Sequence, residues 1–283
     1  MHTDYAQRFI FQNSAIRGEI VRLERSLHTI SQQREYPSSV LKFLGETLVA
    51  NVLLTTTLKF EGQITMQMQH DGPLQMLVAK CNHHLQIRGV AQWDETCSDQ
   101  QLQNSFKHGK LVITLQQNDR VDFYQSVVAI NNQPIAQVME HYFVQSEQLP
   151  TRLWLASNAN VTVGLLVQQI GQEESDREAS ESCWEEVIML TSTITENELL
   201  NLDNETLLHR LYHEHEVRLF NPKPVTFHCG CNITKMQGAI LVMGREEALK
   251  LLNEFKNVSV KCEYCNNEYT FTEAEVLDIL ANH

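Results

Sequence analysis

The sequence predicts an α+β protein in three parts: a large N-terminal domain of mixed sheet and helix, a helical linker and a small C-terminal domain. Stretches of alternating apolar and polar residues, typical of half-buried strands, run through the first 170 residues. Apolar segments with helical spacing lie among them without a regular strand–helix repeat, which indicates α+β. An acidic segment then separates this region from a tail with four closely spaced cysteines.

The first part, residues 1–170, contains the predicted strands. "GQITMQMQ" (62–69) alternates apolar and polar residues, "HDGP" follows as a turn, and "LQMLVAK" (74–80) resumes the pattern, so a hairpin is expected. The same alternation recurs in "HLQIRGVAQW" (84–93) and "KLVITLQQ" (110–117). These four segments are predicted to be strands.

Two helices are expected among these strands. Residues 39–60, "SVLKFLGETLVANVLLTTTLKF", form a long apolar segment with leucines at helical spacing, which predicts a buried helix. Residues 134–149, "PIAQVMEHYFVQSEQL", open with a proline, and proline suits the first turn of a helix.

Residues 171–225 form the predicted linker. They carry 13 acidic against 4 basic residues, whereas residues 1–170 carry 14 against 13. "GQEESDREASESCWEE" (171–186) is predicted to be a loop or linker, and on sequence alone a plain solvated linker is the simplest interpretation.

Two short helices are expected in the rest of the linker. Thr195 and Glu198 match a capping box at the start of the first. Residues 203–220 place apolar side chains along one helical face, and "NPKP" (221–224) is expected to end that helix because proline cannot continue it. The apolar residues are Leu207, Leu208, Leu211 and Tyr212.

The tail, residues 226–283, reads as a separate small domain. "GREEALKLLNEF" is an amphipathic helix, "VSVKC" and "EYTFT" are short strands, and Thr272 with Glu275 caps a last helix. A domain of about 58 residues is marginally stable on its core alone and often needs a further cross-link.

The four cysteines of the tail stand in two pairs, Cys229 with Cys231 and Cys262 with Cys265. A Cys-x-x-Cys on a tight turn presents two sulfurs to one ion, and four thiolates complete the tetrahedral shell that Zn²⁺ prefers. Gly230 allows a bend that aims the first two sulfurs at the same ion. The pattern predicts one zinc ion per chain; the alternative is four ordinary buried thiols.

The spacing leaves the role of this zinc site open. An inert structural site and a redox switch both fit, since thiolates oxidise readily and oxidation abolishes metal binding. Each pair is close enough for a local disulfide, and a Cys-x-Cys ring is tight and therefore labile.

Composition and charge limit the class of protein. With 42% hydrophobic and 20% charged residues the chain reads as globular and soluble. We expect neither a signal peptide nor a stretch approaching the roughly 18–20 apolar residues of a membrane span, hence a cytoplasmic protein. No segment is basic enough to serve as an electrostatic footprint for nucleic acid.

The remaining candidate residues receive no functional role. Three cysteines have no second cysteine close by in the sequence and are interpreted as small buried side chains: Cys81, Cys97 and Cys183. His209 and His213 have a metal-like spacing but no His-Glu-x-x-His motif, so we interpret them as surface histidines. Four cysteines already fill a tetrahedral shell, so His228 is left out of it. The sequence suggests no catalytic triad.

Several motifs together resemble the heat shock protein 33 family, the redox-regulated holdase chaperones of bacteria. They are "AIRGEIVRL", "LLTTTLKFEGQITMQMQHDGPLQMLV", "IRGVAQW", "YFVQSEQLPTRLWLA", "LLHRLYHEHEVRLF" and the "CGC…CEYC" tail, and they span nearly the whole chain. Two small residues depart from the family pattern: Gly230 replaces a usual serine, and Ser126 a usual glycine.

The resemblance implies an ATP-independent chaperone and not an enzyme. In the reduced family members, four cysteines hold zinc and the protein is inactive; the matching positions here are Cys229, Cys231, Cys262 and Cys265. Oxidation with partial unfolding releases zinc and forms two disulfides, after which the linker unfolds and exposes a surface for unfolded client proteins. The resemblance also implies a monomer when reduced and a homodimer when oxidised and active.

Two other functions are weighed against this one. A nucleic-acid-binding zinc ribbon of the transcription or translation machinery needs a basic surface, but residues 226–283 hold 8 acidic against 5 basic residues. An oxidoreductase using Cys262 and Cys265 as a dithiol usually sets this motif at a helix start, and here a β-turn is expected.

Overall fold

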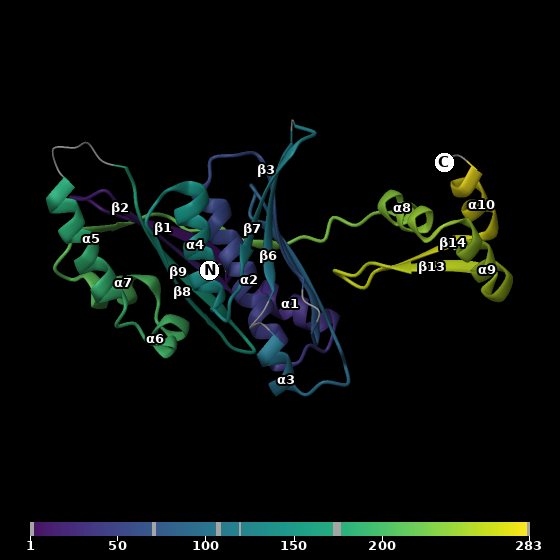
Figure 1. Ribbon diagram of the computed structural model, residues 1–283, viewed down its shortest axis with the longest axis horizontal. Helices are drawn as coiled ribbons and strands as arrows, with labels where there is room; N and C mark the ends of the chain where they lie inside the picture. Colours follow the sequence, from purple (N-terminus) through teal and green to yellow (C-terminus); the bar gives the residue numbers. More distant parts are fainter. Residues whose placement is uncertain (1–2, 70–71, 106–108, 119, 172–176, 282–283) are drawn as a thin grey trace. The chain divides into compact units, whose positions relative to one another are not determined.

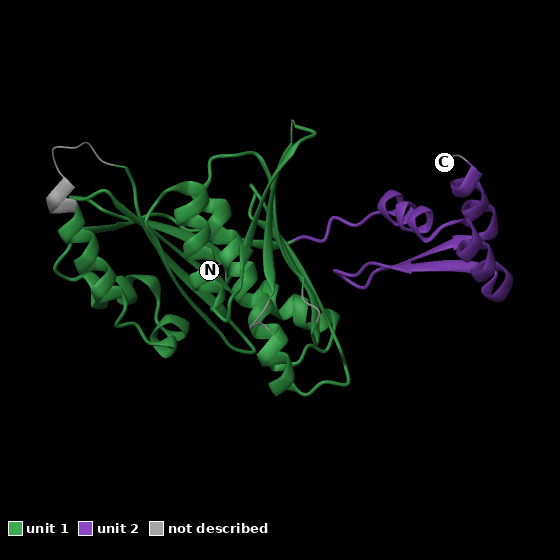
Figure 2. Cartoon of the chain, viewed as in Figure 1, with its two compact units in different colours: residues 1–227 green, residues 228–283 purple. Residues whose placement is uncertain are grey.

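The structure is a computed structural model of the chain. It describes residues 3–69, 72–105, 109–118, 120–171 and 177–281. The chain divides into two compact units, residues 1–227 and 228–283 (Figure 2). Both units combine helices with antiparallel strands, so the predicted α+β class is confirmed.

The first unit contains two six-stranded sheets, which we call sheet A and sheet B (Figure 1). Sheet A has the strand order β10-β1-β2-β9-β8, with β11 also pairing to β1, and all its pairs are antiparallel. Its strands are β1 (Tyr5–Phe11), β2 (Ile16–Leu23), β8 (Thr151–Ser157), β9 (Thr162–Gln169), β10 (Val217–Leu219) and β11 (Lys223–Pro224).

Sheet B has the order β12-β5-β4-β3-β6-β7. The four strands predicted from alternation all belong to it, and their inward positions, such as Met66 paired with Ala79 and Ile113, are buried. The predicted turn at 70–73 lies partly outside the described residues. The strands are β3 (Gly62–Gln69), β4 (Leu74–Asn82), β5 (Gln86–Trp93), β6 (Lys110–Gln117), β7 (Phe123–Ala129) and β12 (Thr226–Phe227).

Helix α2 (Ser38–Thr57) contacts strands of both sheets, and fifteen of its residues are buried. It is long and apolar enough to cross a membrane, so the expectation that no stretch approaches this length is wrong. However, 78% of its most apolar window is buried inside the protein, which accounts for the apolar composition. Gly164 of β9 permits close packing, since a Cβ there would lie 2.4 Å from Val49 Cγ1.

Shorter helices surround this core. They are α1 (Arg25–Gln33), α3 (Asp99–Asn104) and α4 (Ile135–Tyr142). The helix predicted for residues 134–149 is α-helical as far as Tyr142 and continues as a π-helical segment, η2 (Phe143–Glu147). Gln148 then takes a left-handed conformation with φ 56° and ends the segment before Pro150.

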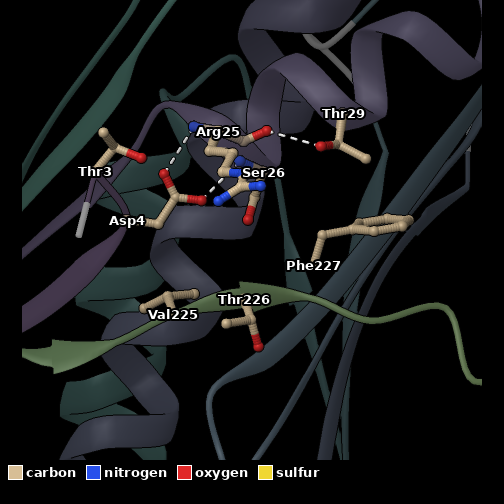
Figure 3. A pocket seen from close by; sticks show the side chains of 8 residues that line it. All are labelled: Thr3, Asp4, Arg25, Ser26, Thr29, Val225, Thr226 and Phe227. Carbon is tan, nitrogen blue, oxygen red and sulfur yellow. Dashed lines mark hydrogen bonds between the residues drawn. The ribbon is translucent and has the colours of Figure 1, made fainter.

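The start of α1 is held by Asp4 (Figure 3). Its carboxylate accepts backbone N–H bonds from Glu24, Arg25 and Ser26 at 2.6–2.8 Å. A cavity of about 530 Å³ beside it is also lined by Thr226 and Phe227 of β12. Because β12 pairs in parallel with β5, the chain is anchored in sheet B immediately before the second unit begins.

Helices α5 (Arg177–Thr191), α6 (Glu196–Asn201) and α7 (Asn204–Tyr212) lie along sheet A, on the side away from α2 (Figure 1). The predicted capping box is confirmed: the Thr195 hydroxyl accepts from the Glu198 backbone N–H, and the Glu198 carboxylate accepts from Thr195. Apolar residues of all three helices share one buried cluster with strands β1, β2, β8 and β9.

Two predictions about this segment are wrong. The loop expected at 171–186 is helical from Arg177, because Val187 and its half-buried neighbours Trp184 and Ile188 give the segment an apolar face for the cluster. The helix expected at 203–220 ends at Tyr212, and residues 217–219 pair with β1 as strand β10. The four residues of the predicted apolar face are buried as expected: Leu207, Leu208, Leu211 and Tyr212.

The second unit contains α8 (Ile233–Met243), α9 (Arg245–Phe255), β13 (Asn257–Lys261), β14 (Glu268–Thr272) and α10 (Glu273–Ala281). The predicted helix, both strands and the Thr272–Glu275 cap are confirmed. Helix α8 was not predicted; the Asn232 side chain caps it by accepting from the Lys235 backbone N–H at 2.9 Å. Seven buried side chains form the core of this unit.

Candidate metal centre

Two turns of the second unit bring four cysteines together. Cys229 and Cys231 precede α8, while Cys262 and Cys265 lie in the turn between β13 and β14. The four Sγ atoms lie within 4.8 Å of one another. The Cys229–Cys262 sulfurs are 3.3 Å apart and the Cys231–Cys265 sulfurs 3.5 Å apart. All seven cysteines of the described residues are thiols without a disulfide.

Local backbone chemistry shapes both turns. Gly230 has φ 65°, a left-handed conformation that glycine adopts without a steric penalty, so the residue between the first two ligands allows a tight bend. In the second turn, Asn266 (φ 54°) donates its backbone N–H to the Cys262 carbonyl at 2.8 Å. The Cys262 N–H in turn donates to the Asn267 carbonyl at 2.9 Å. Asparagine tolerates this conformation better than most residues.

The four thiols differ in their electrostatic surroundings. Burial raises the pKa of Cys229 and of Cys265 above the ordinary value for a thiol. A hydrogen bond from the Tyr269 hydroxyl, 3.2 Å from the sulfur, is the main cause that lowers the pKa of Cys231 to about 7. The same contact raises the pKa of Tyr269 to about 12. The Tyr269 hydroxyl therefore favours the thiolate form of Cys231.

The residues present fit a zinc ion. In a tetrahedral site with Zn–S bonds of about 2.3 Å, neighbouring sulfurs are about 3.8 Å apart. Here two of the sulfur pairs are 3.3 and 3.5 Å apart and all four sulfurs lie within 4.8 Å of one another, which is close enough to share one ion. Four thiolates leave no open coordination position, which is the arrangement of a structural site and not of a catalytic one. The Lys235 ammonium donates to the Gly230 carbonyl at 2.6 Å and holds the first turn near the start of α8.

The other candidate residues lie outside this cluster. Cys81 is fully buried in the core of the first unit, and burial raises its pKa to about 12. Cys97 and Cys183 are half-buried against apolar clusters of that unit. His228 is exposed next to Cys229. His209 and His213 lie with ring centroids 6.4 Å apart on the exposed side of the α7 region.

Tyr269 is the residue of this centre that the sequence analysis missed. It lies 38 positions from the cysteine it contacts. The contact depends on the tertiary structure, because Tyr269 pairs with Val260 in the β13–β14 hairpin whereas Cys231 lies just before α8. In the sequence, Tyr269 stands four residues after Cys265 in a predicted strand, and this spacing does not indicate a contact with Cys231.

The sequence of the chain matches that of a known protein family. The sequence model of the family described as Hsp33 protein matches residues 4–272. The chain belongs to the Hsp33 family. The resemblance drawn from the sequence motifs is thereby confirmed.

Relatives of this Hsp33 family member match it over nearly their whole lengths, and each is named "33 kDa chaperonin". The one from Nitrosococcus oceani is 37% identical over 273 residues, covering 96% of this chain and 93% of the relative. That of Pseudomonas aeruginosa is 39% identical over 286 residues, covering 99% and 95%. That of Shewanella loihica is 40% identical over 284 residues, covering 100% and 97%.

A solved structure shows that the fold is shared. The crystal structure of the 33 kDa chaperonin of Thermotoga maritima matches with a TM-score of 0.80 at 20% identity, covering 98% of both chains. Membership of the Hsp33 family supports a chaperone, and the four-cysteine cluster fits zinc binding and redox sensing. The family therefore favours a chaperone over the zinc-ribbon and oxidoreductase interpretations.

Proposed function

We propose that this protein is a redox-regulated, ATP-independent holdase: a binding protein and not an enzyme, inactive when reduced and loaded with zinc. In this proposal residues 1–170 carry the client-binding surface, residues 171–225 form a metastable linker, and residues 226–283 form the redox switch. The clients are unfolded or partly unfolded proteins, and the active oxidised form is a homodimer. A cytoplasmic location suits thiols that must be kept reduced until stress.

The four-sulfur cluster is the observation that carries this proposal. Zinc would cross-link the two turns through Cys229, Cys231, Cys262 and Cys265. Among the described residues of the second unit, seven buried side chains form a small core, so much of the unit's stability would come from the metal. Losing the ion would therefore unfold this unit.

Oxidation supplies a way to lose the ion. A thiolate attacks peroxide and becomes a sulfenic acid as the O–O bond breaks and hydroxide leaves; a second thiolate then displaces hydroxide and forms the disulfide. We propose the pairs Cys229–Cys231 and Cys262–Cys265. Although the sulfurs of Cys229 and Cys262 lie only 3.3 Å apart, these two residues belong to different turns, 33 positions apart in the chain. Once the unit opens, short loops close at lower entropic cost than long ones.

The cluster beneath helices α5–α7 provides a surface for clients. These helices cover apolar side chains of sheet A, among them Phe9, Phe11 and Ile20, which are at most 3% exposed. Residues 171–225 hold nine more acidic than basic side chains, so self-repulsion opposes their compact packing. Their release would expose a contiguous apolar surface, which is what binding of unfolded chains requires.

The proposal is tested by treating the reduced, zinc-loaded protein with peroxide at heat-shock temperature. We expect release of one zinc ion per chain, measured with a chromogenic chelator, together with suppression of light scattering by a chemically denatured test protein. Equal protection by the reduced protein would refute the switch. Peptide mapping by mass spectrometry then checks the pairing, and disulfides that join the two turns would contradict it.

A further inference from the structure

The contact between Tyr269 and Cys231 links the two halves of the metal centre. The Tyr269 hydroxyl lies 3.2 Å from Cys231 Sγ. Tyr269 belongs to β14, which follows the second cysteine pair, whereas Cys231 belongs to the first pair. The hydroxyl therefore connects the strand behind one turn to a ligand in the other.

The ring of Tyr269 is fixed in a way that aims this hydroxyl. The residue is paired with Val260 on β13, and its half-buried ring packs against the apolar cluster of the second unit. A tyrosine held by its ring presents its O–H at one place with little remaining rotational freedom. A thiolate that ligates a metal has no proton to donate, so the tyrosine hydroxyl donates and the sulfur accepts.

We propose that Tyr269 is a positioning residue of the metal centre, whose hydrogen bond to the Cys231 thiolate helps to retain the metal and slows attack of this sulfur on peroxide. The proposal rests on the function proposed above. It adds that the rate at which peroxide oxidises the metal centre is set in part by Tyr269, a side chain that is not itself a ligand.

Two physical effects support this role. Partners that hydrogen-bond to metal ligands orient them, and their loss typically lowers metal affinity by about 10–100-fold. A donor directed at a thiolate also draws electron density from the sulfur, and the nucleophilicity of a thiolate falls with its basicity. In the oxidation step, the sulfur supplies the electron pair that breaks the O–O bond of peroxide and becomes a sulfenic acid, while hydroxide leaves. Withholding that electron pair slows the step.

The test compares the full-length Tyr269→Phe variant with the wild type. This change keeps the ring and removes only the hydroxyl. Thr270→Val is the matched control, because it also removes one hydroxyl from β14. The Thr270 side chain is exposed, and its hydroxyl lies 3.0 Å from the Ser259 hydroxyl and not beside a cysteine. Each protein is loaded with zinc for competition against a chelator and for peroxide-induced release, and with cobalt for absorption spectroscopy.

We expect Tyr269→Phe to bind zinc about tenfold more weakly and to release it faster on addition of peroxide. The sulfur-to-cobalt charge-transfer band should move to longer wavelength, since the sulfur electrons are no longer stabilised by the hydrogen bond. A merely structural role would leave this band in place. Thr270→Val should match the wild type in all three measurements.

The outcomes separate this inference from the proposed function. If the wild type binds no zinc or peroxide fails to activate it, the proposed function is wrong. If the wild type behaves as proposed but Tyr269→Phe has the same affinity, release rate and cobalt spectrum, only the role of Tyr269 is overturned. Should Tyr269→Phe fail to fold, 3-fluorotyrosine placed at position 269 is a stronger donor of nearly the same shape, and slower zinc release is then expected.

Discussion

At the scale of single residues, the four cysteines could be found from the sequence because each turn places its two ligands within a few positions. The turn residue Gly230 could also be found from the sequence, since glycine adopts a left-handed backbone without a steric penalty. Tyr269 could not be assigned, because its contact depends on how two strands align and on where a distant turn lies. The spacing of the cysteines in the sequence thus predicts the metal ligands, whereas the residues that contact these ligands depend on how the strands and turns are arranged in the fold.

Replacing one ligand tests the cluster directly. Cys231→Ser should weaken zinc binding by more than about tenfold, since even loss of a side chain that only hydrogen-bonds to a ligand has that effect. Mass spectrometry measures the zinc content of the variant, and competition with a chelator measures its zinc affinity. Cys97→Ser is the control, because Cys97 lies in the first unit and is half-buried there. Unchanged zinc affinity in Cys231→Ser would show that this sulfur is not a ligand.

Glu46 gives a pH-dependent prediction. Burial in α2 raises its pKa to about 7, although Lys42 Nζ lies 3.8 Å away. In the unfolded chain its pKa is near 4.5, so the folded protein binds more protons between these values and loses stability as pH rises through them. Glu46→Gln should therefore raise the free energy of unfolding at pH 8, by up to about 3 kcal/mol, and change it little at pH 4. Denaturant unfolding at both pH values measures this, and equal effects would contradict it.

At the scale of elements, alternation and caps predicted strands β3 to β6, helix α2 and most of the second unit. The predictions of secondary structure were wrong where contacts with distant parts of the chain decide between helix, strand and loop. Residues 217–219 have apolar residues that suit a helix face, but β1 offers them an open edge, so they become β10. Likewise an acidic composition indicated a loop at 177–186, while one apolar face was enough for α5 to pack.

Two glycines, one packed between α2 and β9 and one in α8, should respond in opposite ways to substitution by alanine. Gly164→Ala should lower the free energy of unfolding of the first unit by about 1–3 kcal/mol, because its Cβ would overlap Val49. Gly238→Ala in α8 has no atom within 4 Å of its new Cβ and should stabilise that helix by up to about 1 kcal/mol. Chemical denaturation of both variants measures the changes; a neutral or stabilising effect of Gly164→Ala would contradict the close packing of α2 on β9.

At the scale of the whole molecule, the two units differ in what holds them together. The first has two large apolar clusters, one on each side of sheet A, whereas the second combines seven buried side chains with a potential metal cross-link. The sequence indicated this contrast through the length of each region and the position of the cysteines. It could not show that α2 serves as the shared support of both sheets, because that role depends on the strand order.

Removing the metal should affect the units unequally. With a chelator under reducing conditions, we expect amides of β13 and β14 to exchange with solvent deuterium much faster, since the ion no longer stabilises the small core. Amides of β2 and β9, in the centre of sheet A, should keep their protection. Hydrogen exchange followed by mass spectrometry resolves the two. Retained protection of β13 and β14 in the metal-free protein would contradict a metal-dependent unit.

The position of helices α5–α7 in the chain has a consequence for recovery after stress. They lie between β9 and β10, and both strands are hydrogen-bonded into the same sheet. If these helices detach while β10 stays paired, they become a loop tethered at both ends and not a free tail. Their effective concentration at the uncovered sheet then remains high, and re-docking is an intramolecular event that competes with bound clients. Resetting the protein would then need no external partner to bring the helices back.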